Sequence, residues 1–184
     1  ILENEHPLWV SGTTYSIDDK VIYQHRIYNR VIAGGGALTP DLDLTNWSNL
    51  GATNKYRMFD NIISSVSSRT GGIEFTLTPN QVINGIALLN VNASTVRVVM
   101  NDPIEGVVYD RTKELRSSSN VIDYYSYFFA PLINLGDLDT AIFLDLPNKP
   151  TATITVYVSA GSGLVEVGEV VYGMQYVVGR TNYG

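Results

Sequence analysis

The stretch ATITVYVSAGSGLVEVGEVVYG, Ala152 to Gly173, decides the fold of this chain because apolar and polar residues alternate through most of it. The alternation runs through TITVYV and again through VEVGEVV. A period of two is typical of half-buried strands, since successive side chains of a strand point to opposite faces of its sheet. The small residues of SAGSG between the two halves predict a hairpin connection. We therefore expect two strands here, Ala152–Val158 and Leu164–Gly173, joined by a turn.

Similar patterns predict further strands between turn-forming segments such as TPNQ and NDPIEG. These candidates are Ile73–Leu77, Val82–Val91, Thr95–Met100, Val107–Asp110, Val121–Phe129 and Ala141–Leu146. No window has the spacing and capping residues of an amphipathic helix, and the nearest, TKELRSSSN, is too short. About eight strands at this spacing predict an all-β fold, a β-sandwich or jelly roll, over residues 53–184.

The first 52 residues have a different character, because they are rich in Trp and Tyr and their turns are closely spaced. The segment KVIYQHRIYNRVI predicts a hairpin with strands Val21–Tyr23 and Ile27–Ile32 around a polar turn at Gln24–Arg26. A long loop, GGGALTPDLDLTN, follows, and Trp47 begins a last short strand. We expect two domains, a small three-stranded one over residues 1–52 and the sandwich over 53–184, with the break near Asn49–Asn61.

Composition excludes several classes of function. The formal net charge is −6 and the Lys and Arg residues are scattered, so we expect no nucleic-acid partner, because a grip on phosphates needs clustered positive charge. Cysteine is absent, which excludes disulfides, thiolate metal sites and Cys nucleophiles. The first residues have no signal peptide pattern, and the longest apolar runs are far too short to span a bilayer. We therefore expect a soluble protein without membrane insertion.

Catalytic and metal-binding motifs are also missing. His6 and His25 are the only histidines, and no GxSxG elbow is present. The segment GGGALTP lacks the Lys and Ser or Thr of a phosphate loop. Asp41, Asp43 and Thr45 have the alternate spacing of a calcium loop, but the required Gly and Glu do not follow. The sequence predicts no catalytic residue, no metal, no cofactor and no enzymatic activity.

The aromatic residues near the N-terminus follow a recognisable spacing. The pattern W-VSGTTY-SIDDKVIY-QHRIY, closed by a Pro and a second Trp, resembles the small family 5/12 carbohydrate-binding modules of chitinases and cellulases. Asp18 stands where that family usually has Gly, and YNRVI lacks the paired aromatics that many sugar-binding members carry. The matching positions are Trp9, Gly12, Thr13, Tyr15, Asp19, Val21, Tyr23, Tyr28, Pro40 and Trp47.

These aromatics have two alternative roles: the core of a very small module, or a platform on which a sugar ring stacks. A module of this size has little other apolar material, so Tyr15, Tyr23 and Tyr28 are expected in the core. Trp47 stands among polar neighbours, and an outward-facing Trp there would mark a binding site. Trp47, Trp9 and Tyr28 are the candidates for glycan binding.

The remainder of the chain resembles β-sandwich virion proteins of tailed bacteriophages, on the segments NKYRMFD and VVYGMQYVVGRTNYG. This resemblance implies a structural or adsorption component of the tail, tail tip or fibre, located in the virion and present in several copies. Host surface polysaccharide is then a candidate partner. One alternative is a glycan-binding appendage of a secreted polysaccharide-degrading enzyme, and another makes the sandwich itself a lyase or hydrolase.

The segment YYSYFF, Tyr124 to Phe129, suggests a contact with neighbouring subunits. In a strand, both of its faces would be aromatic, so both would be covered. The sheet covers one face, and either a loop or a neighbouring subunit covers the other. Because interfaces favour Tyr and Phe, the candidates for a homo-oligomer interface are Tyr125, Tyr127 and Phe129.

Overall fold

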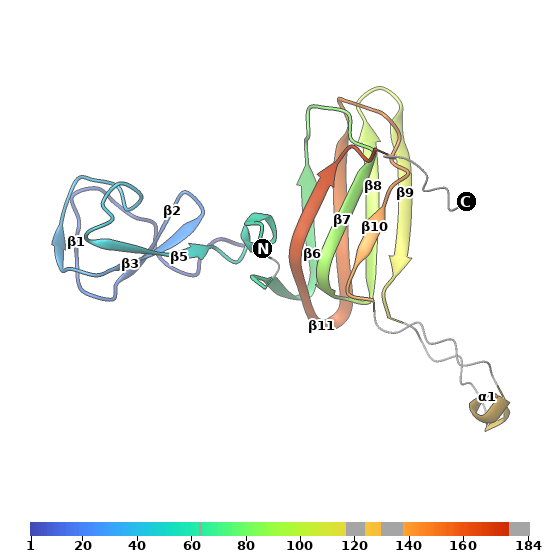
Figure 1. Ribbon diagram of the computed structural model, residues 1–184, viewed down its shortest axis with the longest axis horizontal. Coiled ribbons are helices and arrows are strands. Elements are labelled where there is room, and N and C mark those ends of the chain that lie inside the picture. Colours follow the sequence, from blue (N-terminus) through green and yellow to red (C-terminus); the bar gives the residue numbers. More distant parts are fainter. Residues whose placement is uncertain (63, 117–123, 130–137, 177–184) are drawn as a thin grey trace, which may run out of the picture.

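The computed structural model describes residues 1–62, 64–116, 124–129 and 138–176. Figure 1 shows two separate groups of strands, with the N-terminus beside the segment that joins them. The first strand group holds a three-stranded sheet, β2-β3-β5, and a two-stranded sheet, β1-β4. Its strands are β1 (Thr14–Tyr15), β2 (Lys20–Tyr23), β3 (Arg26–Arg30), β4 (Gly34–Gly35) and β5 (Trp47–Ala52).

The predicted hairpin is confirmed as β2 and β3, which pair from Lys20↔Asn29 to Tyr23↔Arg26. Gln24 and His25 form its turn, with φ angles of 47° and 64°. Two consecutive residues with positive φ give a turn whose twist matches that of the flanking strands. The strand predicted to begin at Trp47 is also confirmed and pairs with β3.

The second group is a β-sandwich, as the alternating patterns predict. Its strands are antiparallel, in the order β10-β7-β11-β8-β9, and β6 pairs with β11 as well. The predicted strands Ile73–Leu77, Val82–Val91, Thr95–Met100, Val107–Asp110 and Ala141–Leu146 are confirmed with shifted bounds. The elements are η1 (Arg57–Phe59), β6 (Ser67–Leu77), β7 (Gly85–Asn92), β8 (Thr95–Asp102), β9 (Gly106–Glu114), β10 (Ala141–Phe143) and β11 (Thr153–Gly173).

The hairpin predicted at SAGSG is wrong, because β11 is one strand that continues through this segment. Its two halves do not pair with each other; both pair with β6, and the register shifts between Ser159↔Gly72 and Leu164↔Thr70. Gly71 and Gly161 have φ angles of 90° and 64°, which glycine adopts without steric cost. Small residues therefore allow an irregularity in a two-stranded ribbon here instead of a reversal of the chain.

The long ribbon of β6 and β11 is shared by both layers of the sandwich. The first half of β11 pairs with β8, and the second half pairs with β7 (Figure 1). One layer is therefore β6-β11-β8-β9 and the other is β6-β11-β7-β10. Strands that pass between sheets at an irregularity are a known way of building the corners of sandwiches. The alternating apolar residues of β11 point into the common core: Ile154, Val156, Val158, Val165 and Val167.

The strand predicted over Val121–Phe129 is wrong for its described part, because Tyr124–Phe129 is the short helix α1. No described strand pairs with this segment. A strand without a partner leaves its backbone groups unpaired, whereas a helix satisfies its own. No helix in the described ranges is long and apolar enough to cross a membrane.

Candidate functional site

Trp47 does not face outward, so of the two alternative roles left open by the sequence its side chain has the core role. Its side chain is 2% exposed, and Tyr28, another glycan-binding candidate, is 4% exposed. Together with Val21 these two side chains form the core of the first strand group. The polar neighbours of Trp47 in the sequence gave no information about what covers its indole ring. Neither ring presents an open face on which a sugar could stack.

Residues from other strands cover the Trp47 ring. The Arg30 guanidinium lies 4.9 Å from the ring centroid, and the ring of Tyr15 meets Trp47 edge-on at 5.1 Å. Trp9, the third candidate, is half-buried against this core, with its ring edge-on to Tyr23 at 5.5 Å. The aromatic residues are thus used for packing, as a module with little other apolar material requires.

Arg30 and the acidic loop after β4 form a buried polar cluster. Arg30 donates a hydrogen bond to the carbonyl of Gly34 at 3.1 Å and lies 3.7 Å from the Asp43 carboxylate. Asp43 also accepts hydrogen bonds from the side chain of Asn46. Burial raises the pKa of Tyr28, and the nearby Asp41 carboxylate adds to that effect. Among the described residues, no His, Cys, Asp and Glu side chains group closely enough to hold a metal ion.

The N-terminal residues and the joining segment hold the two strand groups together. The Glu3 carboxylate lies 3.0 Å from His25 Nδ1 and accepts a hydrogen bond from the Thr53 hydroxyl. The Asn54 side chain donates to the Ser68 carbonyl and accepts from the Ser68 N–H, both at 2.8 Å. The Asn54 amide thus bonds both backbone groups of Ser68, as a neighbouring strand would do. The joining segment is therefore part of the folded structure.

Two ring contacts continue this junction. His25 stacks on Tyr56 with ring centroids 3.9 Å apart, so the β2–β3 turn packs on the joining segment. Met58, in η1, is buried in the sandwich core, and its N–H donates to the Ser67 hydroxyl at 2.9 Å. His25, in the turn of the predicted hairpin, is exposed and also makes this junction contact. No sequence motif could have shown this, because Tyr56 lies far along the chain.

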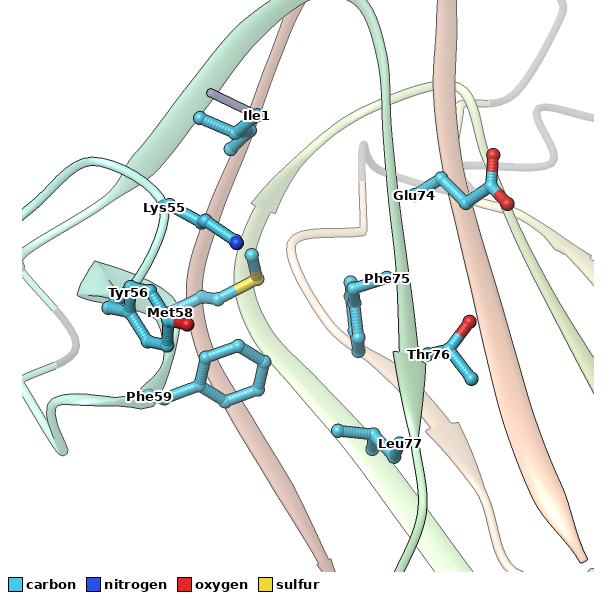
Figure 2. Close-up of a pocket in the computed structure, with 9 residues that line it drawn as sticks. All are labelled: Ile1, Lys55, Tyr56, Met58, Phe59, Glu74, Phe75, Thr76 and Leu77. Atoms are coloured by element: carbon cyan, nitrogen blue, oxygen red, sulfur yellow. The ribbon is translucent and has the colours of Figure 1, made fainter. Parts of the chain in front are cut away.

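A pocket of about 390 Å³ opens between η1 and β6. Figure 2 shows Phe75 and Leu77 pointing toward η1, with Glu74 and Thr76 on the other side of β6. Phe59 and Phe75 meet edge-on at 5.6 Å, and both pack against the sandwich core. The lining is therefore a continuation of that core. It is made by Ile1, Lys55, Tyr56, Met58, Phe59, Glu74, Phe75, Thr76 and Leu77.

A second hollow, of about 360 Å³, lies beside Tyr157 near the irregularity of β6 and β11. Tyr157 pairs with Glu74 of β6 on one side and with Arg97 of β8 on the other. Its position alternates with the buried Val156 and Val158, so its side chain is on the outer face of the layer. We call this the Tyr157 hollow; its lining comprises Arg69, Thr70, Gly71, Gly72, Ile73, Glu74, Tyr157, Val158 and Ser159.

An ion pair fixes the far side of Tyr157. Arg97 donates two hydrogen bonds to the Asp110 carboxylate, at 2.7 and 2.6 Å. This contact lowers the pKa of Asp110 and raises that of Arg97. The Arg97 guanidinium carbon lies 5.8 Å from the centroid of the Tyr157 ring. Sequence reasoning missed this site, although a Tyr at a polar position of an alternating strand was a signal for it.

The candidate interface residues lie on α1. Tyr125 is 72% exposed, and the neighbouring Tyr124 and Phe128 are exposed as well, with their rings edge-on at 5.1 Å. The side chains of Tyr127 and Phe129 lie outside the described part of the chain. The argument from two faces of a strand does not apply to a helix, so the interface remains a prediction based on aromatic composition.

Comparison with family models and with curated proteins finds no match. Among solved structures, the chain is similar to the F5/8 type C domain of a Bacteroides fragilis protein, with 10% sequence identity and a TM-score of 0.42. The match covers 66% of this chain and 82% of that one. No function is transferred from a likeness of this extent.

Proposed function

We propose that the chain is a non-catalytic structural and adsorption component of a tailed-phage virion. The observation that carries the proposal is the packed junction between the two strand groups. Asn54 bonds both backbone groups of Ser68, and Met58 is buried in the sandwich core. A subunit that holds its neighbours at fixed positions in a particle needs its own two parts to be firmly connected. The sequence resemblance to phage virion proteins supports the same role.

The junction favours this role over that of an enzyme appendage. A linker rich in Gly and Ser behaves as a flexible coil, and one rich in Pro acts as an extended spacer. Residues 53–59, TNKYRMF, instead contribute a buried Thr53, a buried Met58 and the Tyr56 ring stacked on His25.

Exposed apolar side chains support contacts with neighbouring subunits. Many of them belong to the first strand group and its loops, although single exposed apolar residues are common on any protein. In an assembly, such side chains become buried against other copies and contribute to its stability. The most exposed examples there are Leu2, Leu8, Leu38, Leu42 and Leu44.

Assembly can be tested directly on the purified protein. We expect sedimentation velocity to give a mass that is a multiple of 20.2 kDa, and negative-stain images to show rings, trimers or tubes. The Tyr125→Ser variant, which changes an exposed residue of α1, should shift the equilibrium toward smaller species if α1 takes part. A protein that sediments as a 20.2 kDa monomer at the highest attainable concentration would contradict the proposed assembly.

The packed junction gives a second prediction. Asn54→Leu keeps the size of the side chain but removes both hydrogen bonds to Ser68, so the first strand group should reorient more freely. Small-angle X-ray scattering should then show a broader distribution of distances than in the native protein. Asn49→Leu is the matched control, because that amide caps only Gly51 within the first strand group. Equal scattering from Asn54→Leu and the native protein would show that these bonds do not hold the junction.

A further inference from the structure

We infer that the Tyr157 hollow binds a neutral sugar residue of a polysaccharide. The inference rests on the adsorption part of the proposed function and gives it a site. That site lies on the sandwich, away from the buried aromatics of the first strand group. The site combines an exposed aromatic ring, side chains that donate hydrogen bonds and side chains that accept them, and two glycines that leave space for a ligand.

Tyr157 supplies the stacking surface. Its side chain is 38% exposed, on the outer face of the layer. Arg97 flanks it from β8 but does not line the hollow, whereas Glu74 flanks it from β6 and does. The hollow is therefore on the β6 side of the ring. The apolar C–H face of a pyranose packs favourably on such an aromatic surface.

The ring is held in place before any ligand arrives. Arg97 lies over Tyr157 from β8, and Asp110 fixes its guanidinium with two hydrogen bonds. A side chain that is already ordered loses less conformational entropy on binding. The ion pair thus acts on the sugar through Tyr157, which makes Arg97 a positioning residue.

Polar groups around the hollow match the hydroxyls of a sugar. Glu74 lines the hollow, and Figure 2 shows its side chain on the side of β6 away from η1; its carboxylate accepts hydrogen bonds from hydroxyls. Arg69 donates them, and the hydroxyls of Thr70 and Ser159 do both. The opposite charges of Arg69 and Glu74 leave no net charge in the hollow. This balance favours a neutral sugar over a uronic acid or a phosphate.

Glycine provides the space for the ligand. Gly72 pairs with Ser159, and Glu74 pairs with Tyr157. The two pairs are neighbours on the outer face of the ribbon, because they lie two residues apart along each strand. A Cβ at Gly72 would lie 3.2 Å from the Val158 carbonyl, so a larger residue would both crowd the backbone and fill the hollow. The irregularity of the ribbon places Gly71 at a φ of 90°, where no other residue fits well. The same glycines that shape the ribbon therefore leave the hollow open.

Isothermal titration with defined oligosaccharides tests the site, whatever the assembly state. The probes are cellohexaose, chitohexaose, a galactan oligomer and, as the charged comparison, an oligogalacturonate. We expect at least one neutral probe to bind, and Tyr157→Ala to weaken binding by about tenfold or more. Tyr157→Phe should retain binding, because it keeps the ring and the fold, whereas Glu74→Gln should weaken it by about threefold to tenfold.

Tyr172→Ala is the matched control, because Tyr172 is an exposed tyrosine on the other half of β11. Binding that falls equally in Tyr172→Ala and Tyr157→Ala would overturn the assignment of the site. Binding of the oligogalacturonate alone would overturn the neutral class of ligand, and no heat with any probe at about 10 mM would overturn the inference as a whole. A monomer that binds sugar refutes only the assembly, and an assembled particle that binds none refutes only the sugar site.

Discussion

Trp47→Ala is expected to unfold the first strand group while the sandwich stays folded. Trp47 is 2% exposed, and it forms a small core with the buried Val21 and Tyr28. Truncation of a buried Trp costs about 3–5 kcal/mol. A group of this size is expected to have a total stability of only about 3–8 kcal/mol. The substitution therefore removes most or all of the stability of this part of the chain.

The loss extends beyond the indole itself. Arg30 is buried over the Trp47 ring, and its charge would remain inside the group without that contact. The ring of Tyr15 would lose its edge-on partner as well. Arg30 keeps its contacts with Gly34 and Asp43 but loses the ring that packs against its guanidinium, and the cavity left by the indole adds to the cost. Because Arg30 and Tyr15 lose contacts as well, we expect the loss of stability to lie toward the upper end of the range given for truncation of a buried Trp.

Limited proteolysis followed by mass spectrometry gives the measurement. We expect cleavage within residues 1–52 of the Trp47→Ala variant and a protease-resistant fragment that contains the sandwich. Leu44→Ala is the control, since Leu44 is 74% exposed in the same part of the chain and its truncation should change stability by less than about 0.5 kcal/mol. An N-terminal region that resists protease equally in Trp47→Ala and Leu44→Ala would show that Trp47 is not its core.

Leu88→Ala is expected to lower the free energy of unfolding of the sandwich by about 2–5 kcal/mol. Leu88 is fully buried in β7, between Ala141 of β10 and Val170 of β11. Removing its side chain leaves a cavity in a core that both layers share. Both layers should lose stability together, because β11 belongs to each of them.

Urea unfolding monitored by far-UV circular dichroism, with hydrogen exchange of the individual strands to follow the two layers, measures this loss, because both tryptophans lie in the first strand group. The midpoint should fall while the dependence on urea stays the same, as expected for a change in stability alone. Leu164→Ala, at a half-exposed position of β11, should have a midpoint close to that of the native protein. A Leu88→Ala variant in which one layer unfolds well before the other would contradict the shared core.

The sequence predicts the inner face of the sandwich well, because the period of two is a direct property of a strand. Ile154, Val156 and Val158 are buried as their alternation requires. It does not predict the path of the chain at SAGSG. Small flexible residues suit a hairpin and an irregular ribbon equally, and the choice depends on the pairing with β6, far away in the sequence.

Long-range pairing also explains why the sequence pointed to Trp47 as a glycan-binding candidate. The polar neighbours of Trp47 suggested exposure, but Arg30 and Tyr15 reach its ring from other strands. Tyr157 is visible in the sequence only as one Tyr in an alternating strand, and its neighbours Glu74 and Arg97 come from β6 and β8. Burial and neighbourhood in a sheet are set by long-range pairing, which local patterns do not contain.

The position of β11 in the chain has a consequence for how the protein is made. Strands β6, β7 and β8 all pair with β11, which leaves the ribosome after every other described strand of the sandwich. Until then, each of them has a free edge that another chain could pair with. Such distant contacts slow folding, because the loop must close before any of them forms. The nascent chain therefore passes through a stage prone to aggregation, which ends only when β11 has emerged and paired with these strands.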